Sequence, residues 1–332
     1  MISPHGVGLV ARQEVRTRLR TGRWKALMTV WFLTVNGTAL FFRLALEASI
    51  SSRDASLHMF GGVLLGVLVL TMLVTPALTA QSINGDRERG TLAALQITRL
   101  SPADIAVGKL AAAWGTGLLV LALTLPCVAL PVLEGAVGAG RAAVTLAVVA
   151  LLIGVVCALA QAWSALVTRS ITSVLLSYLT VFALLVGTPV LFALAVPLTS
   201  EKVTTSRHYA YDREHPDRVW WLLAPNPVVV LADAAPEVPA RRLPVTRYDS
   251  RGRPYTELVR YNRRTDVLGE LGREIRGLRA GGDRRSGDPE RGGPVWPYGL
   301  AFNVLLAGGA LWTTVRRLRT PVRTLPSGVR LA

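Results

Sequence analysis

The chain has 332 residues, of which 51% are hydrophobic and 17% are charged, and its formal net charge is +16. Long apolar runs without charge exclude a soluble globular domain, which would interrupt such runs every few residues. The arginines argue against nucleic-acid binding, because they flank apolar runs or alternate with acids instead of forming one basic surface.

Six long stretches of the chain contain no Asp, Glu, Lys or Arg. About 20 apolar residues cross the hydrocarbon core of a membrane as a helix, and an unpaired ionised group at that depth costs about 2.5–3.5 kcal/mol. We therefore expect an all-α integral membrane protein with six transmembrane helices and no cleavable signal peptide. The stretches are 26–42, 55–85, 110–133, 142–168, 170–200 and 292–315.

The residues before the first apolar stretch are basic. Within Leu9–Arg23, four apolar side chains form a partial stripe against five arginines. The pattern predicts a cytoplasmic amphipathic helix within 1–25. Two roles remain open for this helix: it lies on the anionic membrane face, or it only supplies the positive charge that orients the first span.

The short loops predict the orientation of the spans. Among the short loops and the tail, those after spans two, four and six hold most of the Arg and Lys, so both termini are expected in the cytoplasm. We expect a multi-pass protein of the bacterial plasma membrane with one domain over 1–332. Its parts are the helix within 1–25, spans one to five over 26–198, a large extracytoplasmic segment over 199–295, span six over 296–315 and a cytoplasmic tail over 316–332.

The cytoplasmic loop after span two begins with a short charged segment. Asn84 or Asp86 is expected to cap a short helix, with Glu88 in its first turn. The stretch 91–98 then presents apolar side chains on a surface that water would disfavour. Such a segment suits docking to a soluble partner, and a capped connector that lies on the lipid headgroups remains the alternative.

A second helix start follows in the same loop. Ser101 is placed to cap it, Pro102 occupies the first turn, and Asp104 stands three residues after the cap. This helix is expected to continue as the third span. The Gly108-Lys109 pair within it is not expected to be a phosphate loop, because the first glycine and the final Ser or Thr of that motif are missing.

The segment after span five contains two short apolar runs, Trp220–Leu223 and Val228–Ala232, on either side of Pro225-Asn226-Pro227. Both runs are too short to cross a membrane, and tryptophan favours the membrane interface. They predict a re-entrant or interfacial hairpin in which the two prolines exclude a helix.

The rest of the external segment is polar. Tyrosines and apolar residues over 248–261 predict a short hairpin or helix, whereas 281–293 is expected to be disordered. His208 and His215 favour a solvated loop over a metal site, because seven-residue spacing without further ligands does not build one.

Three motifs follow one another around the third span: Asp86-Arg87-Glu88-Arg89-Gly90-Thr91-Leu92, Leu100-Ser101-Pro102 and Gly108-Lys109-Leu110. Together with the six-span layout, the basic N-terminal helix and Asn226-Pro227, they resemble the signature of the type-2 (ABC-2) family of ATP-binding-cassette transporter permeases. The family frequently has glutamate at the position of Asp86 and proline at the position of Arg99.

The resemblance implies the permease subunit of an ATP-driven exporter, in which two permease copies, or this chain and a paralogue, form the translocation path. A helix over 86–98 would sit in a cleft of a cytoplasmic ATPase subunit. ATP hydrolysis would then belong to the partner, and this chain would be no enzyme and would need no cofactor or metal. The implied coupling residues are Asp86, Arg87, Glu88, Arg89, Gly90, Thr91, Leu92 and Leu95; the helix-opening motif is Leu100, Ser101, Pro102 and Asp104; the re-entrant element is Asn226 and Pro227.

Two other functions remain open from the residues alone. A membrane-embedded enzyme acting on lipid would need a reactive cluster at a span end, for which Glu134 with Arg141 and Glu47 with Asp54 are the candidates. A membrane anchor or sensor would bind an external ligand through 199–297.

Overall fold

The computed structural model describes residues 3–19, 22–92, 100–204, 210–236, 241–248, 252–261, 266–281 and 292–319. Within these residues the chain is predominantly helical, and six helices are long and apolar enough to cross a membrane. The predicted class of a helical multi-pass membrane protein is confirmed at this level. The six candidate spans are Trp24–Glu47, Ser52–Glu88, Pro102–Ala122, Ala139–Leu166, Ser170–Thr199 and Trp296–Arg319.

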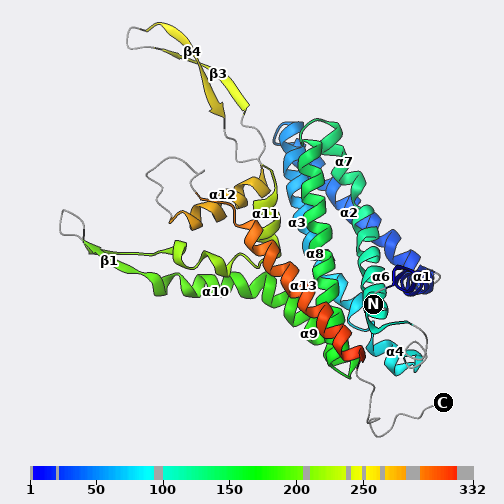
Figure 1. Cartoon of the computed structure of the whole chain (residues 1–332). Coiled ribbons are helices and arrows are strands. Elements are labelled where there is room, and N and C mark those ends of the chain that lie inside the picture. Colours follow the sequence, from blue (N-terminus) through cyan, green and yellow to red (C-terminus); the bar gives the residue numbers. More distant parts are fainter. Residues whose placement is uncertain are drawn as a thin grey trace.

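The first half of the chain builds the centre of the bundle. Its elements are α1 (Pro4–Leu19), α2 (Gly22–Glu47), α3 (Ser52–Thr79), α4 (Asn84–Glu88), α6 (Pro102–Ala122), α7 (Leu125–Leu133) and α8 (Ala139–Leu166). Helices α3 and α8 run side by side in the middle, while α2 lies on one flank and α13 (Trp296–Arg319) on the other (Figure 1).

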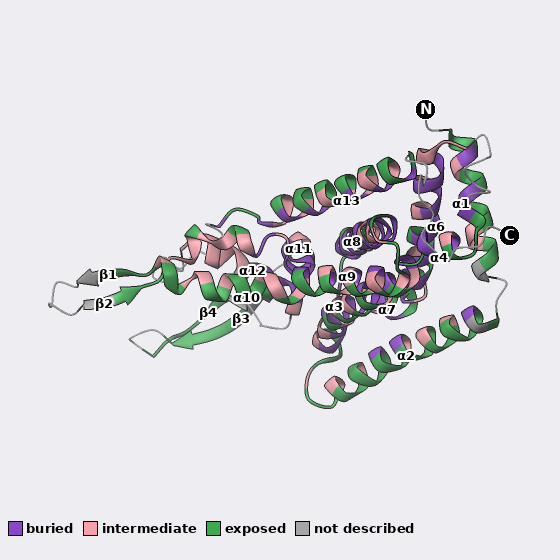
Figure 2. Ribbon diagram, turned by 90° about the horizontal axis from the view of Figure 1, so that it is seen from below, coloured by how far each residue is buried: buried purple, intermediate pink, exposed green. Residues whose placement is uncertain are grey.

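The buried core lies between α3 and α8. Leu64 and Leu68 of α3 are fully buried, as are Leu152 and Ile153 of α8, and all four belong to one apolar cluster. The outer helices differ: most residues of α2 are exposed, and those of α13 are mainly exposed or half-buried (Figure 2). Phe41 on α2 is 73% exposed. Apolar side chains so exposed are stable against lipid but not against water, which agrees with a membrane bundle.

The apolar stretch 110–133 is not one helix, contrary to prediction. Helix α6 ends at Ala122, and α7 begins anew with Pro126 in its first turn, because proline lacks the N–H that an unbroken helix would require. Asn36 of α2 binds both sides of the break: its Nδ2 donates to the Leu123 carbonyl at 2.9 Å, and its Oδ1 accepts from the Cys127 N–H at 3.1 Å.

The fifth span is irregular. It consists of α9 (Ser170–Phe182), the π-helix η1 (Ala183–Gly187), α10 (Thr188–Ala195) and the short 3₁₀ helix η2 (Pro197–Thr199). The chain then forms β1 (Glu201–Thr204), β2 (Ala210–Arg213), η3 (Pro216–Arg218), η4 (Trp220–Leu222) and α11 (Pro227–Ala234). Strands β1 and β2 are an antiparallel hairpin with Glu201 opposite Arg213.

The remainder of the segment between spans five and six contains a second antiparallel hairpin and a helix. Strands β3 (Arg241–Tyr248) and β4 (Pro254–Tyr261) project away from the bundle (Figure 1), so the hairpin alternative is the one observed over 248–261. Helix α12 (Val267–Arg279) was not predicted. Most of 281–293, for which disorder was predicted, lies outside the described residues.

Candidate functional site

The short helix α4 is held by a residue from another span. The Oγ of Ser164 near the end of α8 accepts hydrogen bonds from the backbone N–H groups of Ile83 at 3.1 Å and Asn84 at 3.0 Å. The expected caps, Asn84 or Asp86, are wrong, because Ile83 stands at the N-cap and makes no side-chain bond there. Ser164 supplies the acceptor instead, so α4 is fastened to α8.

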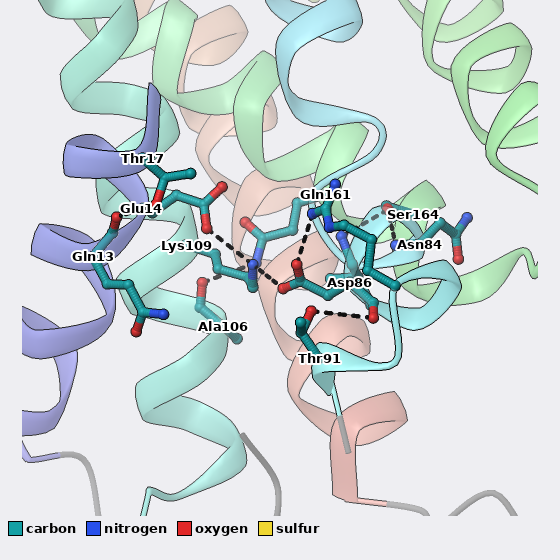
Figure 3. A network of polar contacts seen from close by, with 12 residues as sticks. Gln13, Glu14, Thr17, Asn84, Asp86, Thr91, Ala106, Lys109, Gln161 and Ser164 are labelled. Carbon is teal, nitrogen blue, oxygen red and sulfur yellow. Dashed lines mark hydrogen bonds and ion pairs between the residues drawn. The ribbon is translucent and has the colours of Figure 1, made fainter. Parts of the chain in front are cut away.

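A buried lysine joins α4 to two further helices. Lys109 of α6 is 2% exposed, and its Nζ lies 2.5 Å from an oxygen of Asp86 and 3.2 Å from an oxygen of Glu14 on α1 (Figure 3). The other oxygen of Asp86 binds Arg89 at 2.9 Å. A buried ammonium group is stable only when it is paired, so these two carboxylates account for a lysine inside the bundle.

Close packing of α1 on α6 makes this pairing possible. A Cβ added at Gly108 would lie 2.6 Å from the Cβ of Val10 and 3.0 Å from the carbonyl oxygen of Val7, so only glycine admits α1 this near. The predicted N-terminal helix is present, and Val10 and Glu14 line the face turned to α6 because they lie one turn apart. The start of α1 is also fastened, since the Ser3 N–H donates to Asp104 at 2.7 Å.

The structure divides the predicted coupling residues into two groups. Asp86 and Leu92 are buried and Arg87 is half-buried; Leu92 packs with Ile83 of α4's start and Ile105 of α6. The other group is exposed and consists of Glu88, Arg89, Gly90 and Thr91. Leu95, with the rest of 93–99, lies outside the described residues.

The exposed group is still anchored by its neighbours. Arg89 pairs with Asp86, and the Arg89 side chain is 68% exposed. Glu88 accepts a hydrogen bond from Ser170 at the start of α9 at 2.6 Å. Gly90 adopts a φ of 73°, a left-handed conformation that glycine reaches without strain, and it turns the chain after α4. Two opposite charges are therefore presented at a turn of defined shape.

The helix-opening motif behaves as predicted. The Ser101 hydroxyl accepts from the Asp104 N–H at 3.1 Å, while the Asp104 carboxylate accepts from the Ser101 N–H at 3.0 Å, which is a complete capping box. Pro102 is the first residue of α6, and Leu100 packs against the cluster that includes Ile83.

The residues predicted to form a re-entrant element lie near the opposite end of the bundle, at the start of α11. Pro227 begins α11, so the prediction that the prolines exclude a helix is wrong: a proline in the first turn needs no N–H partner. Asn226 caps this helix by accepting from the Val228 N–H at 2.8 Å. Its Nδ2 also donates to the Leu185 carbonyl of the π-helix at 3.0 Å and to Thr188 at 2.9 Å, which ties α11 to span five.

The other candidate residues are distributed among separate contacts. Glu134 lies 2.6 Å from Arg43 of α2, whereas Arg141 binds Asp266, so Glu134 and Arg141 serve different pairs. His215 lies 3.7 Å from an oxygen of Glu201 and 3.5 Å from one of Asp217. His208 is outside the described residues, and within them no three His, Cys, Asp or Glu side chains converge as metal ligands would.

Sequence analysis missed four residues that organise these sites: Glu14, Asn36, Lys109 as an ion-pair partner, and Ser164. A polar side chain within or beside an apolar helix was the available signal, because such a group must find a partner inside the bundle. No protein-family model matches the chain, and no curated protein matches it by sequence.

Proposed function

We propose that this chain is the membrane-spanning permease subunit of an ATP-binding-cassette exporter and that α4 and the residues after it dock to a separate ATPase subunit. The observation that carries this proposal is the 2.5 Å contact between Asp86 of α4 and Lys109 of α6. A push on α4 reaches span three through this buried pair, and it reaches span four through Ser164.

The exposed charges at the end of α4 provide the docking contacts. Glu88 and Arg89 face outward, while their neighbour Asp86 faces the bundle, so one short segment contacts a partner and the spans at once. Charged contacts between protein surfaces orient partners and select them. This arrangement favours a docking element over a connector lying on headgroups, which would need no buried ion pair to a span.

The proposal assigns ATP hydrolysis to the partner. Gly108 and Lys109, the residues most similar to a phosphate loop, are occupied in packing on Val10 and in pairing with carboxylates. A phosphate-binding lysine must instead reach the nucleotide. The chain accordingly forms the translocation path, either with a second copy of itself or with a paralogue.

The proposal puts the α4 end of the bundle in the cytoplasm. The start of α1 is bound to Asp104, and Leu318 near the end of α13 packs with Ile83 and Ile105, so both described ends of the chain lie at the α4 end. This common location agrees with termini on one side of the plasma membrane.

Charge reversal at the docking residues tests the proposal. Glu88→Arg and Arg89→Glu are expected to reduce cargo-dependent ATP hydrolysis by the purified complex about tenfold or more. The fold is expected to survive, because both side chains are exposed and Lys109 still pairs with Asp86. The measurement is vanadate-sensitive ATP hydrolysis of the full chain copurified with its ATPase in nanodiscs, alongside thermal unfolding.

Arg53→Glu is the matched control, since Arg53 is exposed at the opposite end of α3. It is expected to leave ATP hydrolysis unchanged. The proposal fails if no ATPase activity accompanies the wild-type chain. It also fails in its coupling part if both reversed variants retain the ATPase and transport as the wild type does.

A further inference from the structure

Two ion pairs hold α12 in place: Arg141–Asp266, which joins it to span four, and Arg276–Asp233, which joins it to α11. In the first pair, Nη2 of Arg141 lies 2.7 Å and 2.8 Å from the two oxygens of Asp266, and the side chains are only 4% and 10% exposed. Arg141 also donates to the Pro236 carbonyl. A residue in the first turn of span four thus holds the start of α12.

In the second pair, the carboxylate of Asp233 on α11 contacts both α12 and the start of α13. Asp233 of α11 is fully buried and lies 2.6 Å from Nε of Arg276 on α12. Its other oxygen accepts from the backbone N–H groups of Val295 at 2.6 Å and Trp296 at 2.7 Å, where α13 begins. An anion at a helix N-terminus is stabilised by the unpaired N–H groups and the helix dipole.

Helix α12 also fits the bundle closely. Leu268 is fully buried in the main core, and a Cβ added at Gly61 of α3 would lie 3.3 Å from the Cβ of Val267. On the α11 side, a Cβ at Gly272 would lie 2.9 Å from the Ala232 carbonyl oxygen. Helix α12 therefore packs directly on α3 and α11, unlike the projecting β3–β4 hairpin (Figure 1).

The helix that carries Arg141 is the same helix that carries Ser164. Helix α8 runs unbroken between them, about 35 Å at ~1.5 Å rise per residue. One end of α8 therefore holds α12, and the other end holds α4. A continuous helix packed in a core moves as a rigid element, so displacement of α4 changes the position of Arg141.

We propose that α12 is a lid on the outer end of the bundle, that the Arg141–Asp266 pair latches it, and that α8 carries movement of α4 to this latch. Arg141 acts as a positioning residue, because it holds α12 through Asp266 and does not contact the docking residues at α4. The transmission part rests on the proposed coupling to an ATPase, whereas the latch part concerns the chain by itself.

Labelling of a buried position on the inner face of the lid tests the latch. Leu268→Cys places a thiol where the closed lid excludes a membrane-impermeant maleimide, and the parent chain with buried Cys127 and Cys157 gives the background. In nanodiscs, Arg141→Met is expected to raise the labelling rate of this thiol about tenfold, since loss of one partner of a buried pair favours local opening.

Two further variants make this result specific. Arg247→Met removes an exposed arginine of the segment between spans five and six, paired with Glu257 at 3.1 Å, and is expected to leave labelling unchanged. Asp266→Asn removes the other partner of the Arg141–Asp266 pair. It is used in place of Arg141→Met if thermal unfolding shows that Arg141→Met is not folded. Labelling that stays at the wild-type rate in a folded latch variant overturns the lid.

The transmission part is tested with the copurified ATPase. ATP with vanadate is expected to change the labelling rate of the Cys at 268 severalfold, and Ser164→Ala is expected to abolish this response without changing the resting rate. If Arg141→Met raises the labelling rate but ATP with vanadate does not change it, the transmission part is wrong and the latch part stands. If no ATPase copurifies, the proposed function fails, and the latch comparison on the isolated chain still decides the lid.

Discussion

Lys109→Met is expected to lower the free energy of unfolding by about 3–5 kcal/mol, because buried Asp86 loses the ammonium group with which it pairs on α6. Glu14 loses its partner on α6 in the same variant. The ion-paired contact between α1, α4 and α6 would be weakened. Because this contact couples α4 to the spans in the proposed function, ATP hydrolysis by the complex would also lose its dependence on cargo. The measurements are thermal unfolding followed by tryptophan fluorescence, and ATP hydrolysis in nanodiscs.

A double variant separates the ion pair from the loss of a side chain. Asp86→Asn combined with Lys109→Met removes both charges and is expected to recover part of the lost stability, since an uncharged pair has a smaller desolvation cost. Lys25→Met, at an exposed lysine of α2, is the control and is expected to unfold as the wild type does. Equal melting of Lys109→Met and Lys25→Met would refute the buried pairing.

Gly299→Ala is expected to separate α13 from α11 and the residues just before it. A Cβ at this position would lie 2.0 Å from the Ala224 carbonyl oxygen and 2.6 Å from a methyl carbon of Val230. The backbone oxygen cannot rotate away, so the two segments must move apart, at a cost of about 1–3 kcal/mol or more. The hydrogen bond from Asn303 to the Pro225 carbonyl, at 3.0 Å, would be lost with this contact.

Two glycines further along α13 provide the control. Gly308 and Gly309 have no neighbour within 4 Å of an added Cβ, so alanine there is expected to be neutral or slightly stabilising in a helix. The measurements are the thermal midpoint and the rate of proteolysis between spans five and six. If Gly299→Ala has the same thermal midpoint and cleavage rate as Gly308→Ala, the close approach of α13 to Ala224 and Val230 is wrong.

Local chemistry made the helix starts predictable only where both partners are neighbours in the chain. The capping box of Ser101 and Asp104 was predicted because its two residues lie within one turn. The start of α4 was predicted wrongly because its cap, Ser164, lies 80 or more residues away. Pro227 shows the same limit: proline permits a first turn as readily as it ends a helix, and neighbouring structure selects between them.

The sequence by itself determined that this is a helical membrane protein with six apolar spans, since uncharged runs of that length are stable as helices in lipid. Only the tertiary structure decided which buried polar groups meet: Lys109 with Asp86 and Glu14, Asn36 with the break after α6, and Arg141 with Asp266. The physical reason is that the hydrophobic effect and lipid act on every apolar residue alike, whereas an ion pair or hydrogen bond depends on which helices become neighbours.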